Sequence, residues 1–571
     1  MSLLTDFLDE PKIAYFSMEI GLRKEIPTYS GGLGVLAGDT IKSAADLKLP
    51  LIAVTLLSRK GFFEQDITPE GRQVEYPSEW NPSDYMEVLP EKVAVEIEGR
   101  EVFVRAWLYI VESIIGGRVP VLFLDTDMEE NSPEDRTITD YLYGGDRLYR
   151  IKQEIVLGIG GVRMLSTLGF EIKKYHMNEG HSAFLTLELL RRYRRSIEEV
   201  WDEKLVWDTE KVRDMCVFTT HTPVEAGHDR FSHDLVARCL GDFIPLDVLK
   251  ELGGEEDNIN MTLLALNLSD YVNGVAKKHR DVSRVMFPGY EIHAITNGVH
   301  SFTWTSESFK RLFDRYFPGW ANEPELLVRV EKIAHEEIWQ AHMEAKRHLI
   351  DYVNETTGTG MNYDTLTIGF ARRATAYKRG DLLFRDIERL KKIAGGKVQI
   401  IYAGKAHPQD EPGKKTIERI FSYIGQLRDS IKIAYLKNYN MEIAFKMVSG
   451  VDVWLNTPLR PLEASGTSGM KAAHNGVLNF SVLDGWWIEG YIEGYTGWSI
   501  GPAPSELTPD EETADRRDSE DLYNKLEQEI IPLYYGDRDG WIRMMQHAIG
   551  KIAYYFNSHR MMRRYVTEGY L

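Results

Sequence analysis

The strongest candidate for chemistry lies between Glu463 and Gly476, where small and hydroxyl side chains lead to a single lysine, Lys471. This run follows an apolar stretch that predicts a buried strand, so it stands at a strand-to-helix junction. Thr467, Ser468 and the backbone amides there could hold a phosphate at the start of the helix. Lys471, one turn further along, is placed where an amine could bind a cofactor covalently. Spacing alone leaves an ordinary helix cap with a surface lysine equally open.

A second cluster consists of basic residues that follow a predicted strand. Arg372, Arg373, Lys378 and Arg379 lie close together, and Lys405 follows the next strand. The carboxyl edge of parallel strands is where open α/β sheets bind phosphate, and the planar guanidinium group of arginine matches phosphate oxygens. The alternative is a solvated basic surface, although positive charge is unfavourable near a helix N-terminus. The cluster therefore favours an anion site.

A glycine loop precedes a predicted helix near the N-terminus, where Gly32 to Ala37 fit the pattern G-x-G-x-x-A. No strand runs directly into this loop and no acid ends the next strand, which disfavours a dinucleotide site. Free backbone amides at a helix N-terminus still suit an anion.

Three polar residues of the first half follow predicted strands, namely His181, His221 and Asn297. Their side chains could point into a cleft, although a lone histidine after a strand is more often a hydrogen-bonded structural residue. No pair of neighbouring histidines has the spacing of metal ligands, so no metal site is predicted.

These candidates need a scaffold, and the dominant rhythm of the chain is a short apolar strand, a turn and an amphipathic helix. That rhythm is typical of parallel α/β sheets, and strands that are apolar throughout are expected where helices cover both faces. Strands are predicted at 12–17, 51–57, 119–126, 215–221, 290–296, 366–371, 398–403, 431–436, 451–455 and 477–483, with a β-hairpin at 93–98 and 101–109. Helices are predicted at 40–47, 145–168, 183–194, 324–354 and 441–448.

The predicted fold is α/β, with two doubly wound Rossmann-like domains that face a central cleft. The domain boundary is placed between residues 297 and 324, before the longest predicted helix. The predicted domains are residues 1–300, with the hairpin insertion and the glycine loop; residues 301–540, with the lysine and basic clusters; and residues 541–571, a C-terminal helix that packs back on the first domain.

Composition excludes several classes of protein. The 571 residues are 43% hydrophobic and 27% charged, as in ordinary globular proteins, and no apolar run is long enough to span a membrane. A net charge of −19 argues against nucleic acid as a partner. Two cysteines, Cys216 and Cys239, fit a reducing compartment, so a cytoplasmic location is predicted.

The negative charge is expected to be uneven. Residues 505–529 form an acidic run that predicts a solvated helical insertion, whereas the cluster around Arg372 and Lys471 is basic. The sequence therefore predicts a basic island inside an acidic surface. An aromatic stretch at 486–498 could stack on sugar rings, but packing in the core is the favoured interpretation.

Taken together, these clusters resemble the α-glucan phosphorylase family, which includes glycogen, starch and maltodextrin phosphorylases. The run from Glu463 to Lys471 is similar to the family's pyridoxal-phosphate signature E-A-S-G-T-x-x-M-K, although Ser468-Gly469 replaces its usual Gly-Asn. The basic cluster resembles the family's phosphate segment, and residues 30–37 resemble its glycine loop. The chain is similar to the short prokaryotic members, with the two-domain architecture called GT-B.

The resemblance implies a role for each matching residue. Pyridoxal 5′-phosphate would be held by Lys471, with Thr467, Ser468, Gly469 and Arg372 around it. Arg373, Lys378 and the amides of Gly31 and Gly32 would bind substrate phosphate. The implied catalytic residues are Lys471, Arg373, Lys378 and His221, and the implied substrate-binding residues are Gly31, Gly32, Leu33, Asn297, Tyr377, Glu463, Ser465 and Gly466.

The activity implied by the resemblance is reversible, retaining phosphorolysis. Inorganic phosphate would remove the terminal α-1,4-linked glucose of a glucan as α-glucose 1-phosphate. The implied partners are the glucan, phosphate and a second copy in a homodimer, with no nucleic acid or membrane. Two other classes stay open at this point: a sugar-nucleotide glucosyltransferase on the same fold, which needs no pyridoxal phosphate, and a glucan-binding protein without turnover.

Overall fold

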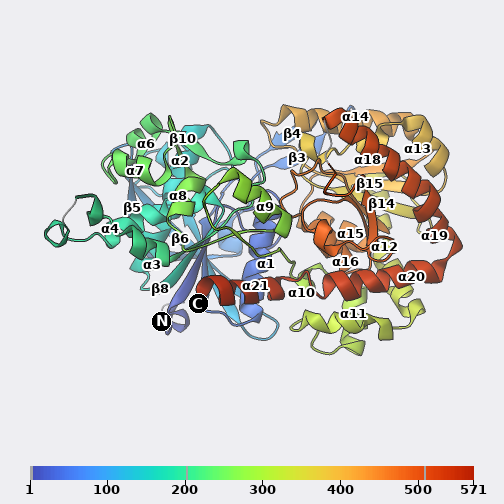
Figure 1. The fold of residues 1–571 in the computed structure, drawn as a ribbon, viewed down its shortest axis with the longest axis horizontal. Helices are drawn as coiled ribbons and strands as arrows, with labels where there is room; N and C mark the ends of the chain where they lie inside the picture. The colour runs from blue at the N-terminus through green and yellow to red at the C-terminus, as the bar shows by residue number, and fades with distance from the viewer. Residues whose placement is uncertain (1–3, 201–202, 507–509) are drawn as a thin grey trace.

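The computed structural model describes residues 4–200, 203–506 and 510–571, and it contains two large sheets side by side (Figure 1). The nine-stranded sheet has the order β13-β12-β9-β8-β1-β2-β7-β6-β5, and the six-stranded sheet has the order β16-β15-β14-β17-β18-β19. All neighbours in the second sheet are parallel, whereas β5, β6 and β7 pair antiparallel at the edge of the first. The predicted α/β fold with doubly wound sheets is confirmed.

The first sheet is covered by helices on both faces, and two apolar cores fill those faces. Its strands are β1 Lys12–Ser17, β2 Leu51–Leu56, β5 Glu87–Ile97, β6 Arg100–Glu112, β7 Arg118–Asp125, β8 Ile172–Asn178, β9 Cys216–Thr219, β12 Tyr271–Gly274 and β13 His293–Ala294. Around it lie α1 Gly32–Asp46, α2 Arg147–Ile155, α3 Gly161–Thr167, α4 Leu185–Arg192, α5 Thr209–Asp214, α6 His233–Leu240, α7 Leu246–Gly253, α8 Met261–Asn267 and α9 Lys277–Met286, with the short pair β10 Arg230–Ser232 and β11 Asn258–Asn260.

The second sheet has one continuous core that spans both of its faces. Its strands are β14 Leu366–Ala371, β15 Val398–Ala403, β16 Lys432–Leu436, β17 Val453–Asn456, β18 Leu478–Val482 and β19 Gly497–Ile500. Its helices are α10 Ser301–Trp304, α11 Glu307–Tyr316, α12 His335–Thr357, α13 Ile387–Ala394, α14 Glu411–Leu427, α15 Met441–Gly450, α16 Ser468–Ala473, α17 Trp487–Gly490, α18 Glu511–Lys525, α19 Ile531–Gly536 and α20 Arg538–His547. The last helix, α21 Ser558–Tyr565, returns to the first half and packs against α1.

Some elements differ from the predicted ones. The β5–β6 hairpin exists but extends the main sheet through β7. The helix predicted at 324–354 is two elements, a 3-10 helix at Pro324–Lys332 and α12. Bases end the first element and acids begin the second, a charge pattern that favours a helix end followed by a helix start.

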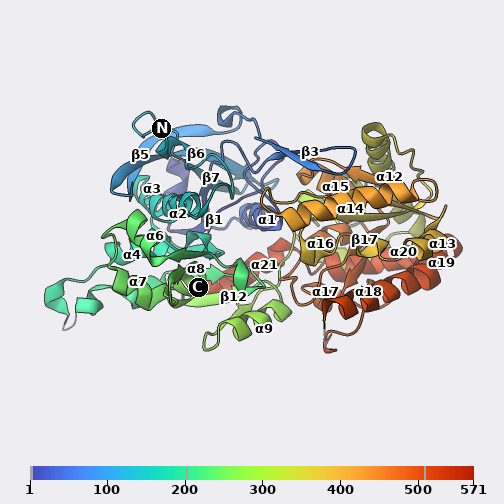
Figure 2. The ribbon, with the colours of Figure 1, turned by 90° about the horizontal axis from the view of Figure 1, so that it is seen from above.

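Two segments cross between the sheets. The hairpin β3 Glu64–Ile67 and β4 Gln73–Tyr76 reaches from the first half over the second (Figure 2), where Gln65 and Gln73 donate to the carbonyls of Gly404 and Ala406 at 2.9 and 2.8 Å. The C-terminal helices run from the second half back to the first (Figure 1). Residues 541–556 pack in the second core, whereas Tyr565 and Tyr570 pack on the first sheet.

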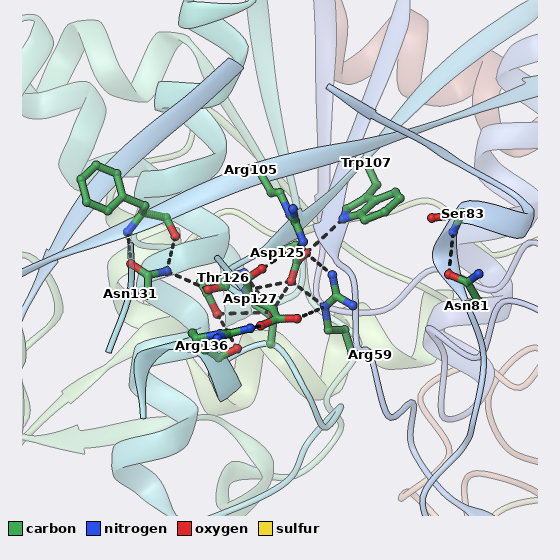
Figure 3. Close-up of polar contacts among 12 residues, drawn as sticks. Arg59, Asn81, Ser83, Arg105, Trp107, Asp125, Thr126, Asp127, Asn131 and Arg136 are labelled. Atoms are coloured by element: carbon green, nitrogen blue, oxygen red, sulfur yellow. Dashed lines mark hydrogen bonds and ion pairs between the residues drawn. The ribbon is translucent and has the colours of Figure 1, made fainter. Parts of the chain in front are cut away.

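The segment that follows β7 is anchored by a buried carboxylate. Asp125 accepts hydrogen bonds from Arg59 at 2.7 Å, from Arg105 at 3.0 Å and from the Trp107 indole at 3.0 Å (Figure 3). These bonds fix the end of the strand, from which the chain runs on to Tyr143 at the cleft. Among the described residues, no helix is long and apolar enough to cross a membrane.

Candidate active site

A cavity of about 990 Å³ lies between the two halves and is lined by residues from both. Nearly all the residues singled out in the sequence meet on its walls. From the first half come Gly31, Gly32, Leu33, His221 and Asn297; from the second come Arg372, Arg373, Tyr377, Lys378, Glu463, Ser465, Gly466, Thr467, Ser468 and Lys471. Gly469 lies behind the wall, where a Cβ atom would come within 2.2 Å of Asn479 Oδ1.

Lys471 lies in the short helix α16, with its amine at the cavity wall. Burial lowers the pKa of Lys471 to about 8, with a smaller opposing effect of Asp39. The amine lies 4.1 Å from the centre of the Trp304 ring and has no hydrogen-bond or ion-pair partner among the described residues. Asp39 of α1 holds that indole by accepting its N–H at 2.9 Å. A buried amine of lowered pKa is suited to reaction with an aldehyde.

The basic cluster is organised around one carboxylate, Glu463. Its oxygens accept from Arg372 at 2.6 Å and from Lys378 at 2.9 Å. Burial alone would raise the pKa of Glu463, but the two cations outweigh it and hold the pKa at about 2. The Arg372 Nε atom is buried and has no partner among the described residues, so this group retains a donor for an anion.

Two further cations of the cluster face the cavity. Arg373 is exposed at the wall, and a Cβ atom on Gly31 across the cleft would lie 3.8 Å from its Nη2 atom. Lys405 donates to the Phe63 carbonyl at 2.8 Å, and burial lowers the pKa of Lys405 to about 8. Both cations can therefore contribute to an anion site.

Arg379 does not take part in the predicted basic island. Its backbone adopts a left-handed conformation (φ 47°), and its buried guanidinium pairs with Asp515 at 2.8 Å and Asp518 at 2.6 Å. Both acids belong to α18, so the acidic run is not simply a solvated insertion: one face of this helix neutralises Arg379. The cavity wall also carries carboxylates, including those of Glu19, Glu179 and Glu463, so its charge is mixed.

On the opposite wall, His221 is held as a neutral ring. Its Nε2 donates to Asn178 Oδ1 at 2.6 Å, and burial lowers the pKa of His221 to about 3. Glu179, whose backbone is strained (φ 76°), accepts from the His221 amide at 2.7 Å. The Asn297 Oδ1 atom is buried and has no partner among the described residues, so it offers an acceptor for a hydroxyl group.

The three tryptophans of the aromatic stretch pack in the core, as favoured from the sequence, whereas Tyr491 and Tyr495 are half-buried. Trp486, Trp487 and Trp498 are buried, and none of them lines the cavity. Trp486 packs edge-on against Phe556, and Trp498 lies against Trp541.

Sequence reasoning missed residues whose partners lie on other elements. Glu19, Asp39 and Trp304 have no local motif, although Glu19 lies two residues beyond β1, at the sheet edge where ligands bind. A buried cluster of Asp46, His300 and His559 was also missed, since it joins segments far apart in the chain.

This cluster is a hydrogen-bonded junction. The Nε2 atoms of His300 and His559 lie 2.7 and 2.8 Å from one oxygen of Asp46. The Thr303 amide donates to the other ring nitrogen of His300, which leaves the proton on Nε2 to be donated to Asp46. With that proton in place, His300 Nε2 is not a metal ligand, so hydrogen bonding accounts for the cluster.

Comparison with known proteins places these residues in context. A family model described as carbohydrate phosphorylase matches residues 230–493. Maltodextrin phosphorylase of Thermococcus litoralis is 45% identical over 98% of this chain and 70% of its own length. Glycogen phosphorylase of Aquifex aeolicus is 38% identical over 98% of this chain and 86% of its own length. An uncharacterized protein of Methanocaldococcus jannaschii is 33% identical over 98% of this chain and 99% of its own length.

Proposed function

The chain belongs to the family of carbohydrate phosphorylases, and we propose on that basis that its cleft carries out reversible, retaining phosphorolysis of α-1,4-glucans. In this reaction inorganic phosphate removes the terminal glucose as α-glucose 1-phosphate, which makes the enzyme a glycosyltransferase, an α-1,4-glucan phosphorylase. The observation that carries the proposal is the meeting of the Lys471 amine with Arg372, Arg373 and Lys378 on one cavity wall.

Pyridoxal 5′-phosphate is the cofactor that we assign to this wall. Two features of the chain fit it: an amine of lowered pKa without a polar partner among the described residues, and an unpaired buried N–H of Arg372. Lys471 would hold the cofactor covalently, with Thr467, Ser468 and Arg372 near its phosphate and Gly469 on the side of α16 that packs against Asn479. When bound, the cofactor supplies a phosphate group that can exchange a proton with the substrate phosphate.

The cations of the wall would hold substrate phosphate close to this group. Two phosphates repel each other strongly in a site of low dielectric, and each nearby cation reduces that repulsion. Arg373 and Lys378 are the residues that we assign to substrate phosphate, with Tyr377 beside them. The Gly31 amide already donates to Glu19, whereas no acceptor among the described residues takes the Gly32 amide. We therefore assign the loop's contribution to Gly32 and Leu33.

The sugar would lie against polar groups from both halves of the cleft. His221 and Asn297 are proposed to hold the hydroxyl groups on one side of the ring, and Glu463, Ser465 and Gly466 those on the other. A neutral His221 retains its ring orientation through Asn178, so a hydroxyl group meets a fixed partner. Enclosure by both halves would exclude water, which otherwise competes with phosphate for the glucosyl group.

The partners are an α-glucan and inorganic phosphate, and the location is the cytoplasm, which the buried, free thiols of Cys216 and Cys239 support. The homodimer stays a prediction that chromatographic sizing would test. We further propose that residues 1–300 and 301–540 act as two domains that close on the substrate.

The test of the cofactor assignment compares the purified protein with Lys471→Ala. The wild-type protein is expected to show the absorbance of bound pyridoxal phosphate, and the variant is expected to lose both this absorbance and phosphate-dependent release of glucose 1-phosphate. A Lys471→Ala protein with full activity would contradict the assignment. Turnover of a sugar nucleotide without pyridoxal phosphate would instead favour the glucosyltransferase alternative.

A further inference from the structure

We propose that Glu19 is a positioning residue for substrate phosphate: its carboxylate fixes the loop of residues 28–34 so that the amides of Gly32 and Leu33 face the cleft. This inference rests on the proposed function, because it assigns those amides to the phosphate of that reaction. Glu19 lies two residues beyond β1 and is only 1% exposed.

The contacts of Glu19 account for the start of the loop. Its Oε2 atom accepts from the Ser30 amide at 2.6 Å and from the Gly31 amide at 3.2 Å. Its Oε1 atom accepts from the Tyr143 hydroxyl at 2.8 Å. Hydrogen bonds to an ionised carboxylate are stronger than those between neutral groups, so these bonds set the direction of the chain as it enters α1.

The glycines show which side of the loop is closed and which is open. A Cβ atom at Gly34 would come within 2.5 Å of Glu19 Oε2, so only glycine lets the carboxylate reach under the loop. A Cβ atom at Gly32 would meet nothing within 4 Å, and Gly32 and Leu33 line the cavity. The loop thus has an inner side occupied by Glu19 and an outer side turned to the cleft.

The loop is also held from the second half of the molecule. The Tyr29 hydroxyl accepts from the Met441 amide at 3.1 Å, and Arg373 faces Gly31 across the cleft. The Glu19 carbonyl in turn accepts from the Ser17 hydroxyl at 2.7 Å, which fixes the residue to the end of β1. Displacement of the loop would therefore separate its amides from the cations that we assign to phosphate.

Glu19 could affect phosphate through its charge as well as through its hydrogen bonds, and two substitutions separate these effects. In Glu19→Gln the carbonyl oxygen can still accept from both amides, and the amide group can donate to the Tyr143 hydroxyl, while the charge is lost. In Glu19→Asp the charge is kept, but the shorter side chain withdraws the acceptor from the loop. If Glu19 acts by positioning, Glu19→Asp weakens phosphate binding more than Glu19→Gln does. If it acts by charge, Glu19→Gln has the larger effect.

The experiment measures KM for phosphate and KM for maltoheptaose with the holoenzyme, and the dissociation constant of inorganic phosphate by equilibrium titration. Positioning predicts that Glu19→Asp and Glu19→Ala weaken phosphate binding by about tenfold or more, because both variants lose the hydrogen bonds that hold the loop. In Glu19→Gln, phosphate binding is expected to stay within about threefold of the wild-type value. KM for maltoheptaose is expected to stay within about twofold in all three variants.

The matched control is Asp125→Asn, another buried carboxylate of the first sheet, which does not line the cavity. It should lower the melting temperature and leave KM for phosphate unchanged. Wild-type phosphate binding in Glu19→Asp together with altered binding in Glu19→Gln would overturn the inference in favour of charge. If the wild-type protein binds phosphate but releases no glucose 1-phosphate, the proposed function fails, while the titration still decides the role of Glu19.

Discussion

Single residues of the cleft depend on one another through charge, and Glu463 shows this most clearly. The carboxylate is 6% exposed and lies between Arg372 and Lys378. Without it, two cations would face each other in a partly buried wall, with no protein anion between them. Glu463 therefore keeps Arg372 and Lys378 in place in the absence of substrate, in addition to any contact with sugar.

The variant Glu463→Gln tests this dependence. An amide cannot neutralise two cations, so we expect the free energy of unfolding to fall by about 3 kcal/mol, the scale for breaking a buried pair, and KM for phosphate to change as well. Urea unfolding and steady-state kinetics measure the two effects. The control is Glu442→Gln, an exposed pair with Lys24 that should change stability by less than about 1 kcal/mol. Equal stabilities of the two variants would contradict the buried pairing.

At this scale, local strings of residues predict some of the residues that line the cavity and miss others. Lys471 and Arg373 were predicted because a distinctive string surrounds each of them. Glu19 and Asp39 were missed, since each acts through a partner on another element. Arg379 was wrongly grouped with the cleft cations because sequence spacing does not show the left-handed turn that points its side chain to α18.

Among the elements, α18 has a buried face with an ion pair that its acidic composition does not indicate. The helix is rich in acids, yet Ala514, Asp518 and Leu522 are buried along one face at helical spacing. Asp518 lies on that face and pairs with Arg379 and Arg460. A charge run thus predicted the helix and its mostly solvated surface, but not the acid that closes a buried ion pair.

We expect Asp518→Asn to destabilise the second half without affecting phosphate. Loss of the carboxylate leaves the buried Arg379 guanidinium with less neutralisation, so the free energy of unfolding should fall by up to about 3 kcal/mol. KM for phosphate should stay the same, because Arg379 does not line the cavity. Chemical denaturation and initial-rate kinetics are the measurements. An increase in KM for phosphate with no loss of stability would show that Arg379 works in the cleft after all.

The strands of the two sheets are predicted from the sequence, whereas the β3–β4 hairpin, which reaches from the first half to the second, is not. The parallel strands are apolar and buried on both faces, which gives a clear sequence pattern. The β3–β4 hairpin has no such pattern, because Gln65 and Gln73 are buried through hydrogen bonds to carbonyls of the second half. Burial of polar side chains by a distant partner cannot be read from the segment itself.

Polar junctions and buried neutral histidines join segments that lie far apart in the chain. Asp46 joins α1 to His300 and His559, and His176 joins the first sheet to the Tyr570 hydroxyl near the C-terminus. Burial alone would raise the pKa of Asp46, but the bonds from both histidines hold it well below its usual range. Burial lowers the pKa of His176 to about 3 and that of His474 to about 4.

These shifts predict how stability depends on pH. The unfolded chain binds a proton at each histidine near the ordinary pKa of about 6.5, whereas the folded chain does not until the pH approaches the lowered values. The contribution of these histidines to stability should therefore be constant above about pH 7 and fall as the pH drops below about 6.5, by about 2 kcal/mol for each such histidine by about pH 5.

Urea midpoints across this pH range measure the dependence, and His176→Asn should make it shallower. A stability that stays flat down to about pH 5, or an equal slope in His176→Asn, would show that these rings are not held neutral by the fold.

The net charge of −19 describes the whole molecule and not the cavity. The cations Arg372, Arg373, Lys378 and Lys405 gather at one cavity, although carboxylates share its walls. A global charge therefore says little about the ligand of an enclosed site. The anion that this arrangement favours is phosphate, the attacking group in phosphorolysis.

The most direct test supplies maltoheptaose to the purified holoenzyme with and without inorganic phosphate and measures glucose 1-phosphate. We expect release of α-glucose 1-phosphate only when phosphate is present, in proportion to the shortened glucan. Release of free glucose without phosphate, or no reaction in either mixture, would contradict the assignment of this cleft to phosphorolysis.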